Sequence, residues 1–369
     1  MKLNAIQCLR ALAVVLVVYV HSIDLQMTFS KSIQQDLFYL QNFGAIGVDL
    51  FFVISGFIIT YIANEYRGWK DAKHFLAKRF IRINPVYYVA SCLFLSINLI
   101  YFLIINRNID IGRTIESLCD TLFVVPVAKD PREFGPILII GWTLCFEWIF
   151  YIMFCFFIII KSRYKLTQLI LLVILLVVIG RCFKISDYRV LFATNPILLE
   201  FLLGMVICWW YQNRNVGKTL SIVLFMSGIM GYICLVIFGY GQISEAGNIL
   251  SGILSLKRVL LWGGPSSLLV AGSVFMERNG LLRYAWTNRY LQVIGDASFS
   301  IYLVHMSVIF MIRLCYERFG FFLDPDLSVF VHLTFGVLLS VLFYKWIERP
   351  LLGKLQKSFF TKGHSLLAS

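Results

Sequence analysis

The chain has 369 residues, of which 59% are hydrophobic and only 14% are charged, and its formal net charge is +13 at pH 7. Soluble domains are about one-quarter charged, so this composition excludes a soluble protein and indicates an integral membrane protein. The nine cysteines are scattered without a Cys-x-x-Cys pair, which argues against a disulfide framework and a zinc site. The positive charge falls in alternate short loops, which argues against a nucleic-acid partner.

Ten apolar segments predict an all-α fold, a polytopic membrane helix bundle with about ten transmembrane helices. A helical span needs roughly 20 predominantly apolar residues to cross the hydrocarbon core. The first segment follows Lys2 and has no small-residue cleavage site after it, so we expect a retained signal anchor. The ten segments cover residues 3–23, 44–65, 84–105, 140–160, 166–183, 194–211, 219–239, 258–276, 291–315 and 327–347.

Basic residues indicate which loops face the cytoplasm. They gather after the even-numbered segments, as in the connection between the second and third, which holds Arg67, Lys70, Lys73, Lys78, Arg79 and Arg82. The connection 106–139 mixes acidic and basic residues, and Arg181 and Arg189 after the fifth segment oppose the pattern. We therefore predict that both termini are cytoplasmic, with a transmembrane domain over residues 1–350 and a short basic cytoplasmic tail over residues 351–369.

Five ionisable residues stand out inside or beside the predicted spans, where a charge costs about 2.5–3.5 kcal/mol on insertion scales. They are Arg10, His21, Asp49, Glu147 and His305. Arg10 and His21 are separated by eleven positions, which corresponds to roughly 16 Å of helix rise and returns both side chains to within about 20° of one direction. One face of the first span is therefore predicted to face the protein interior, with Arg10 near the cytoplasm.

The predicted topology brings His21, Asp49, Glu147 and His305 to the outer half of the membrane. Each residue alone has a structural alternative, since a lone histidine can be a packed, hydrogen-bonded residue and Asp49 can cap a helix start. Four titratable groups from four spans at one depth favour a functional cavity.

Two arginines form a second cluster at the inner side. Arg79 and Arg82 lie one helical turn apart, just before Pro85. Arginine offers planar, paired donors that suit phosphate groups. An ordinary cytoplasmic anchor of the positive-inside kind is the alternative interpretation.

Six motifs follow one another along the chain and resemble the pattern of the membrane-bound acyltransferase-3 family, which O-acylates bacterial surface and exported sugars. They are Arg10-x10-His21, Gly44-x-x-Gly47-x-Asp49-x-Phe51-Phe52-x-x-Ser55-Gly56-Phe57, Arg79-x-x-Arg82-x-x-Pro85, Trp142-Thr143-Leu144-x-x-Glu147-x-x-Phe150-Tyr151, Gly295-Asp296-Ala297-Ser298-Phe299-Ser300-Ile301-Tyr302-Leu303-x-His305 and Glu348-Arg349-Pro350. Glu200-Phe201-x-x-Gly204 fits the middle of the pattern. Thr143 replaces the usual serine of the fourth motif, and Trp148 stands where a polar residue often follows Glu147.

The resemblance implies an O-acetyltransferase of the bacterial inner membrane. Its donor would be cytoplasmic acetyl-coenzyme A, its acceptor a hydroxyl of an exported or surface polysaccharide, and no metal would take part. His21, supported by Asp49 or Glu147, would act as a base or carry the acyl group covalently. The coenzyme phosphates would bind to Arg10, Arg79 and Arg82. The acceptor-side or structural positions would be Trp142, Ser298, Tyr302, His305 and Glu348.

Three other functions fit parts of the sequence. A flippase or transporter of a lipid-linked sugar also needs a polar cavity between spans, although the chain has no two-fold repeat. A structural membrane subunit would tolerate apolar residues at the polar positions. A transferase of succinyl or longer acyl groups would share every motif. Direct transfer and a histidine-bound intermediate are equally compatible with the sequence.

Overall fold

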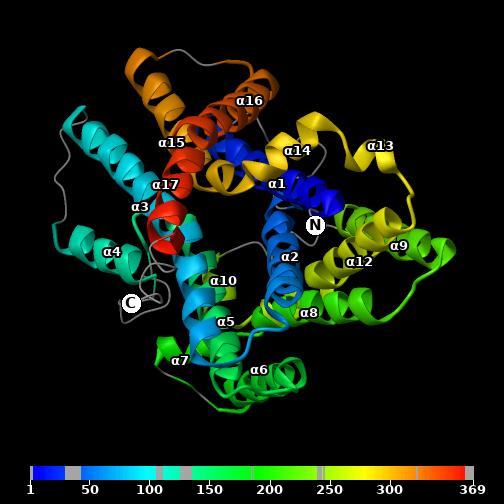
Figure 1. Cartoon of the computed structure of the whole chain (residues 1–369). Coiled ribbons are helices and arrows are strands. Elements are labelled where there is room, and N and C mark those ends of the chain that lie inside the picture. Colours follow the sequence, from blue (N-terminus) through cyan, green and yellow to red (C-terminus); the bar gives the residue numbers. More distant parts are fainter. Residues whose placement is uncertain are drawn as a thin grey trace.

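Ten long apolar helices dominate the computed structural model (Figure 1). The structure describes residues 3–29, 43–104, 111–124, 135–183, 185, 187–238, 243, 246–320 and 323–361. Within these ranges the regular structure is helical and contains no strand. Ten helices or helix runs there are long and apolar enough to cross a membrane. The prediction of an all-α, polytopic membrane bundle is therefore confirmed.

The spans follow the predicted order, and short helices lie between them. The spans are α1 (Asn4–Phe29), η2 and α2 (Phe43–Ala45, Ile46–Ala63), α3 (Gly68–Ile104), α5 (Trp142–Ile159), α6 (Lys165–Cys182), α7 and α8 (Tyr188–Ala193, Leu198–Asn213), α9 (Lys218–Phe238), α11, η5 and α12 (Ser255–Arg258, Val259–Gly263, Gly264–Arg278), α15 (Ser298–Phe319), and α16, η6 and α17 (Pro325–Phe343, Tyr344–Glu348, Arg349–Thr361). The short helices are α4 (Ile111–Phe123), η3 (Ile139–Gly141), α10 (Ala246–Leu250), α13 (Arg283–Trp286) and α14 (Arg289–Asp296).

Three predicted spans differ most clearly from the structure. The ninth span was expected at 291–315, but α15 begins at Ser298, and Arg289–Asp296 forms the separate helix α14. The third span was expected at 84–105, but α3 begins at Gly68 and continues through Pro85. Proline removes one backbone donor from a helix, yet the flanking turns remain helical here, so the basic residues before it belong to the span. The last span continues through η6 into α17, so the predicted tail is helical up to Thr361. Its end, 362–369, lies outside the described residues, as does part of the 106–139 connection.

Helices α1, α2, α8 and α12 form the centre of the bundle. The most apolar windows of α2, α8 and α12 are 67% buried and that of α1 is 61% buried, against 22% for α6 and α9. Figure 1 accordingly shows α1 and α2 near the middle, with α6 and α9 at the periphery. These helices therefore have many side chains shielded from lipid.

Glycines allow the central helices to pack closely. A Cβ atom on Gly56 of α2 would overlap the backbone of Phe201, and one on Gly204 of α8 would overlap the carbonyl of Val53. Small residues at such crossings let two backbones approach within a membrane, where dispersion and polar contacts hold helices together. Two glycines of the sequence motifs are thus explained by the packing of α2 against α8.

The first helix is fixed at its start by an acid from α12. The backbone N–H groups of Asn4 and Ala5 donate to the Glu277 carboxylate at 2.9 and 2.8 Å. A carboxylate there satisfies free amides and complements the positive end of the helix dipole. This contact joins the start of α1 to the end of α12. The face of the bundle that holds these ends, together with α17, is called the terminal face below.

Adding one methyl group at this crossing should destabilise the bundle. We expect Gly204→Ala to lower stability by about 1–3 kcal/mol, because overpacking displaces backbone. The measurement is the thermal midpoint of the detergent-solubilised protein, followed by size-exclusion chromatography after heating. Gly264→Ala is the matched control, since nothing lies within 4 Å of a Cβ there. Equal midpoints for both variants would contradict the close packing of α2 on α8.

Candidate active site

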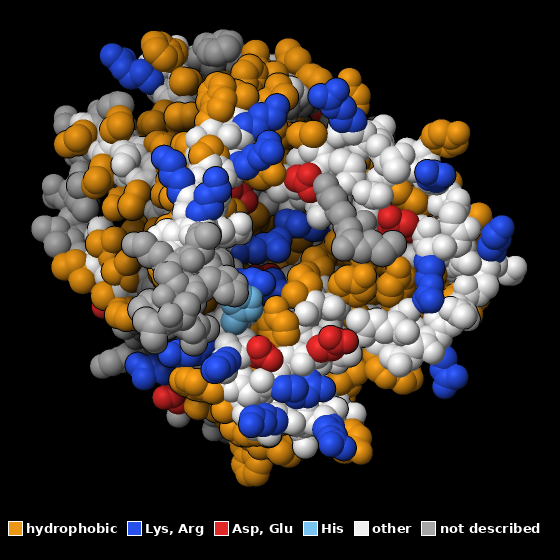
Figure 2. Space-filling view, viewed as in Figure 1, with side chains coloured by type: hydrophobic (Ala, Val, Ile, Leu, Met, Phe, Trp, Pro, Cys, Tyr) orange, Lys and Arg blue, Asp and Glu red, His pale blue; other side chains and the backbone are white. Residues whose placement is uncertain are grey.

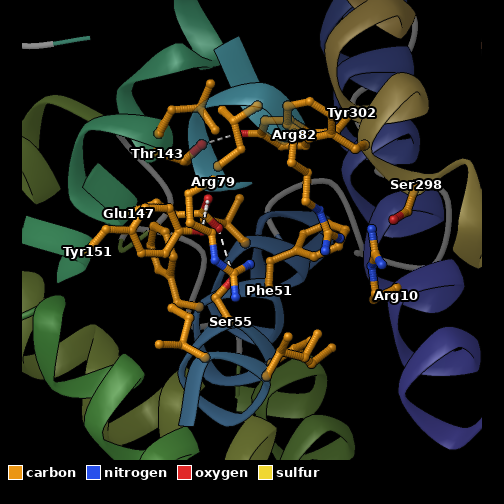
Figure 3. A pocket seen from close by; sticks show the side chains of 18 residues that line it. Arg10, Phe51, Ser55, Arg79, Arg82, Thr143, Glu147, Tyr151, Ser298 and Tyr302 are labelled. Atoms are coloured by element: carbon orange, nitrogen blue, oxygen red, sulfur yellow. Dashed lines mark hydrogen bonds between the residues drawn. The ribbon is translucent and has the colours of Figure 1, made fainter. Parts of the chain in front are cut away.

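A narrow cavity of about 90 Å³ lies between α1, α2, α3, α5 and α15. It is called the central cavity below (Figure 3). Its polar lining comprises Arg10, Ser55, Arg79, Arg82, Thr143, Glu147, Tyr151, Ser298 and Tyr302, and the remainder is apolar. All three arginines that the resemblance assigns to coenzyme phosphates therefore line one cavity, although α1 and α3 supply them from distant parts of the sequence.

The most buried of these arginines is held by aromatic rings. Arg79 is 7% exposed, and its guanidinium carbon lies 5.5 Å from the ring centre of Phe75 and 5.4 Å from that of Tyr151. Rings in this position stabilise a cation through their π faces. They leave the edge of the guanidinium, which carries its donors, available to the cavity (Figure 3).

Glu147 belongs to the same end of the bundle as the arginines. It accepts hydrogen bonds from the hydroxyls of Ser55 at 2.8 Å and Tyr151 at 3.1 Å, as Figure 3 shows. The structure does not bring Glu147 into contact with His21, because these two bonds hold its carboxylate in the central cavity that Arg79 also lines. Its charge offsets part of the positive charge there.

Two serines of the fifth motif have different environments. Ser300 donates to the carboxylate of Glu348, which fixes η6 against α15. Ser298 lines the central cavity and is fully buried, and no described group accepts from or donates to its hydroxyl. A buried hydroxyl without a partner is costly, so Ser298 is a candidate ligand contact and Glu348 is a structural residue.

His21 and His305 form a hydrogen-bonded pair. The distance from His305 Nε2 to His21 Nδ1 is 3.1 Å, and His305 Nδ1 lies 2.8 Å from the carbonyl oxygen of Ile301. A carbonyl only accepts, so His305 Nδ1 carries a proton, and the Nε2 atom of a neutral His305 is an acceptor. His21 then donates from Nδ1, which leaves the lone pair of its Nε2 available. His305 is fully buried and His21 is half-buried.

Tyr302 lies between the central cavity and this histidine pair. Its hydroxyl donates to the carbonyl oxygen of Ile140 at 3.0 Å and lies 3.0 Å from the hydroxyl of Thr143. Its ring lines the cavity and lies 6.3 Å from the ring of His305. Trp142 is not part of the cavity lining. Its ring packs among aromatic side chains, with its centre 6.3 Å from that of Phe52, so Trp142 is a core residue.

Asp49 has a partner that the sequence interpretation missed. Arg258 Nε and Nη2 donate to its two oxygens at 2.8 and 2.7 Å, and both side chains are at most 1% exposed. The fully buried Glu200 lies beside them, and the guanidinium stacks 4.5 Å from the ring centre of Trp262. The expectation that Asp49 supports His21 is wrong, because a paired, buried Arg258 occupies its carboxylate.

The signal for Arg258 was present in the sequence. Lys257 and Arg258 begin the eighth apolar segment, at the side that the positive-inside rule assigns to the outside. A basic residue that violates that rule at a span end has to be neutralised within the protein. Asp49, at the same predicted depth, was the available acid.

The described ranges contain no candidate metal site: no three His, Cys, Asp or Glu side chains there lie close enough together to hold an ion.

Comparison with known proteins relates this geometry to a family. The family model described as an acyltransferase domain matches residues 3–345. The chain belongs to the acyltransferase-3 family. It is therefore an acyltransferase, as predicted, and a multi-pass membrane protein. This membership favours enzymatic transfer over the flippase and structural-subunit alternatives.

Two curated relatives give the family context. The chain is 33% identical over 313 residues to the exopolysaccharide production protein ExoZ of Rhizobium meliloti (strain 1021), covering 84% of this chain and 90% of that protein. It is 26% identical over 344 residues to the O-acetyltransferase OatA of Staphylococcus aureus (strain NCTC 8325 / PS 47). That match covers 86% of this chain but only 54% of OatA. No solved structure matches the chain.

The buried ion pair should contribute to stability instead of catalysis. We expect Arg258→Met to destabilise the protein by about 3–5 kcal/mol, because it leaves the charge of Asp49 buried and uncompensated. The double variant Asp49→Asn/Arg258→Met should recover part of that loss. Thermal midpoints of the three proteins in detergent measure both effects. A single variant Asp49→Asn that keeps its midpoint but loses transfer activity would instead assign Asp49 to the chemistry.

Proposed function

We propose that this chain is an O-acetyltransferase that moves an acetyl group from acetyl-coenzyme A to a sugar hydroxyl of an exported or surface polysaccharide. The observation that carries the proposal is the chemical difference between two neighbouring places. Arg10, Arg79 and Arg82 line a narrow cavity suited to an anionic donor, and His21 next to His305 has a lone pair suited to a hydroxyl acceptor. Tyr302 separates the two places.

The relatives support the identity of the acyl group and of the acceptor. OatA is named an O-acetyltransferase, and ExoZ is named an exopolysaccharide production protein. The proposed setting is the bacterial inner membrane, with the terminal face in the cytoplasm, where acetyl-coenzyme A is made. The basic residues of α3 and α17 support that orientation.

In the proposed reaction His21 acts as the general base. Its Nε2 atom accepts the proton of the sugar hydroxyl while the hydroxyl oxygen forms a bond to the thioester carbonyl carbon. The carbon–sulfur bond then breaks, and His21 returns the proton to the departing thiolate. The products are an O-acetyl sugar and free coenzyme A. His305 fixes the tautomer, since its Nε2 atom holds the Nδ1 proton of His21.

The same nitrogen would serve a two-step route. His21 Nε2 would attack the thioester first and carry the acetyl group until a sugar hydroxyl accepts it. Radiolabelled acetyl-coenzyme A supplied without acceptor distinguishes the routes. Label that stays on the wild-type protein after rapid denaturation, and is missing in His21→Ala, selects the covalent route. Label that never stays on the protein selects direct transfer.

Loss of His21 should abolish the glycan ester. We expect His21→Ala to reduce transfer by about 10²–10⁴-fold, the usual contribution of general base catalysis. Mass spectrometry of surface glycans before and after mild alkali, in a deletion strain complemented with each variant, measures the base-labile acetyl increment. Normal acetylation by a well-expressed His21→Ala protein would overturn the proposed role of His21.

His305 offers a sharper test of the tautomer. His305→Gln keeps a carbonyl acceptor for the Nδ1 proton of His21, whereas His305→Phe keeps a ring of similar size without an acceptor. We expect His305→Gln to retain more of the turnover rate than His305→Phe at equal thermal midpoints. The measurement is initial rates at saturating donor. Equal rates for the two variants would show that His305 acts only through packing.

A further inference from the structure

A second, wider cavity opens on the terminal face. It has a volume of about 700 Å³, within the size range of small-molecule sites, and is called the basic vestibule below. It is lined by Tyr66, His74, Phe75, Lys78, Arg79, Arg82, Gln356 and Lys357, with two isoleucines. Figure 2 shows the hollow in this face, with Lys and Arg side chains around and inside it and a histidine at its rim.

The positive charge of the vestibule comes from the regular geometry of α3. His74, Lys78 and Arg82 follow one another at four-residue spacing, so they lie on one side of the helix, and Arg79 adjoins them. Lys357 of α17 lines the same cavity. Four permanent cations therefore line one site, and two helices far apart in the sequence supply them.

The vestibule and the central cavity share two residues. Arg79 and Arg82 line both, so they lie where the wide space meets the narrow one. The central cavity, of about 90 Å³, has room for a thin chain and not for a nucleotide. A donor with a bulky anionic head and a slender arm matches this arrangement, with the head in the vestibule and the arm in the central cavity.

We propose that the basic vestibule binds the 3′-phosphorylated ADP head of coenzyme A and that Lys78 and Lys357 recognise its 3′-phosphate. This inference rests on the proposed donor. The diphosphate adjoins the pantetheine arm, so Arg79 and Arg82, at the junction, hold the diphosphate with paired donors. The lysines line only the vestibule and meet the more distant 3′-phosphate, which carries about −1.5 to −2 charges.

The ring of Tyr66 provides a place for adenine. Tyr66 is part of the vestibule lining, and its ring centre lies 6.2 Å from that of His74. Bases stack on such rings with little sequence or substituent preference. The phosphates, and not the base, therefore give the vestibule its selectivity among thioester donors.

Donors that differ by one phosphate test the assignment. The wild-type protein should have a KM for acetyl-dephospho-coenzyme A about tenfold or more above that for acetyl-coenzyme A, because charge-assisted hydrogen bonds are lost. In Lys78→Met/Lys357→Met the KM for acetyl-coenzyme A should rise by a similar factor and equal that for the dephospho donor. The turnover rate at saturation should stay unchanged, since both lysines are remote from the reacting atoms.

Matched variants control for the loss of charge. Lys70→Met on α3 and Lys354→Met on α17 remove exposed lysines from the same two helices outside the vestibule lining, and they should leave the KM for both donors unchanged. Wild-type protein that uses both donors equally would overturn the proposal. So would a double variant that still discriminates between them as the wild type does.

Binding without turnover separates this inference from the proposed function. Coenzyme A and dephospho-coenzyme A are added to purified protein in detergent, and the rise of the thermal midpoint is measured. A larger rise with coenzyme A that disappears in Lys78→Met/Lys357→Met supports the vestibule even where no acetyl transfer is detected. Transfer activity without that preference overturns the vestibule alone. Stabilisation by anionic phospholipid and not by coenzyme A would identify a lipid headgroup site instead.

Discussion

A polar side chain inside a membrane bundle needs a partner from the protein, because lipid offers none. Three clusters of ionisable residues meet this constraint, whereas the buried hydroxyl of Ser298 does not. Asp49 and Arg258 neutralise each other between α2 and α11, and Glu147 is held by two hydroxyls beside the arginines of the central cavity. His21 and His305 share a hydrogen bond between α1 and α15. The fold can bury these groups only because glycine contacts such as Gly56 on Phe201 bring the central helices together.

Helix α1 links the two functional ends of the molecule. Arg10 lines the central cavity and His21 pairs with His305, and both project from the inner face of one helix. The carboxylate of Glu277 holds the start of this helix, and His332 of α16 lies 3.5 Å from the carbonyl of Ser22 near its other end. The spacing of the proposed donor and acceptor sites is therefore set by one helix with contacts at both ends, which suits a transfer reaction that depends on position.

The sequence predicted the elements well, and the interior pairings less well. Span count followed from hydropathy, and the common face of Arg10 and His21 followed from helical periodicity. Depth along the membrane did not identify partners, because it does not say to which side of its helix a residue points. Asp49 and Ser55 show this on α2: one points to Arg258 and the other to Glu147. The start of α3 was missed because its charged first turns lower the hydropathy, although the helix continues through Pro85.

Tyr302 connects two of these places, the central cavity and the histidine pair. Its ring borders the central cavity and neighbours His305, while its hydroxyl is bound to Ile140 and near Thr143 at the start of α5. In the proposed reaction, a thioester held by the arginines would pass this side chain to reach His21. In this proposal a single aromatic residue would keep the donor and acceptor sites apart and would protect the thioester from water until an acceptor is present.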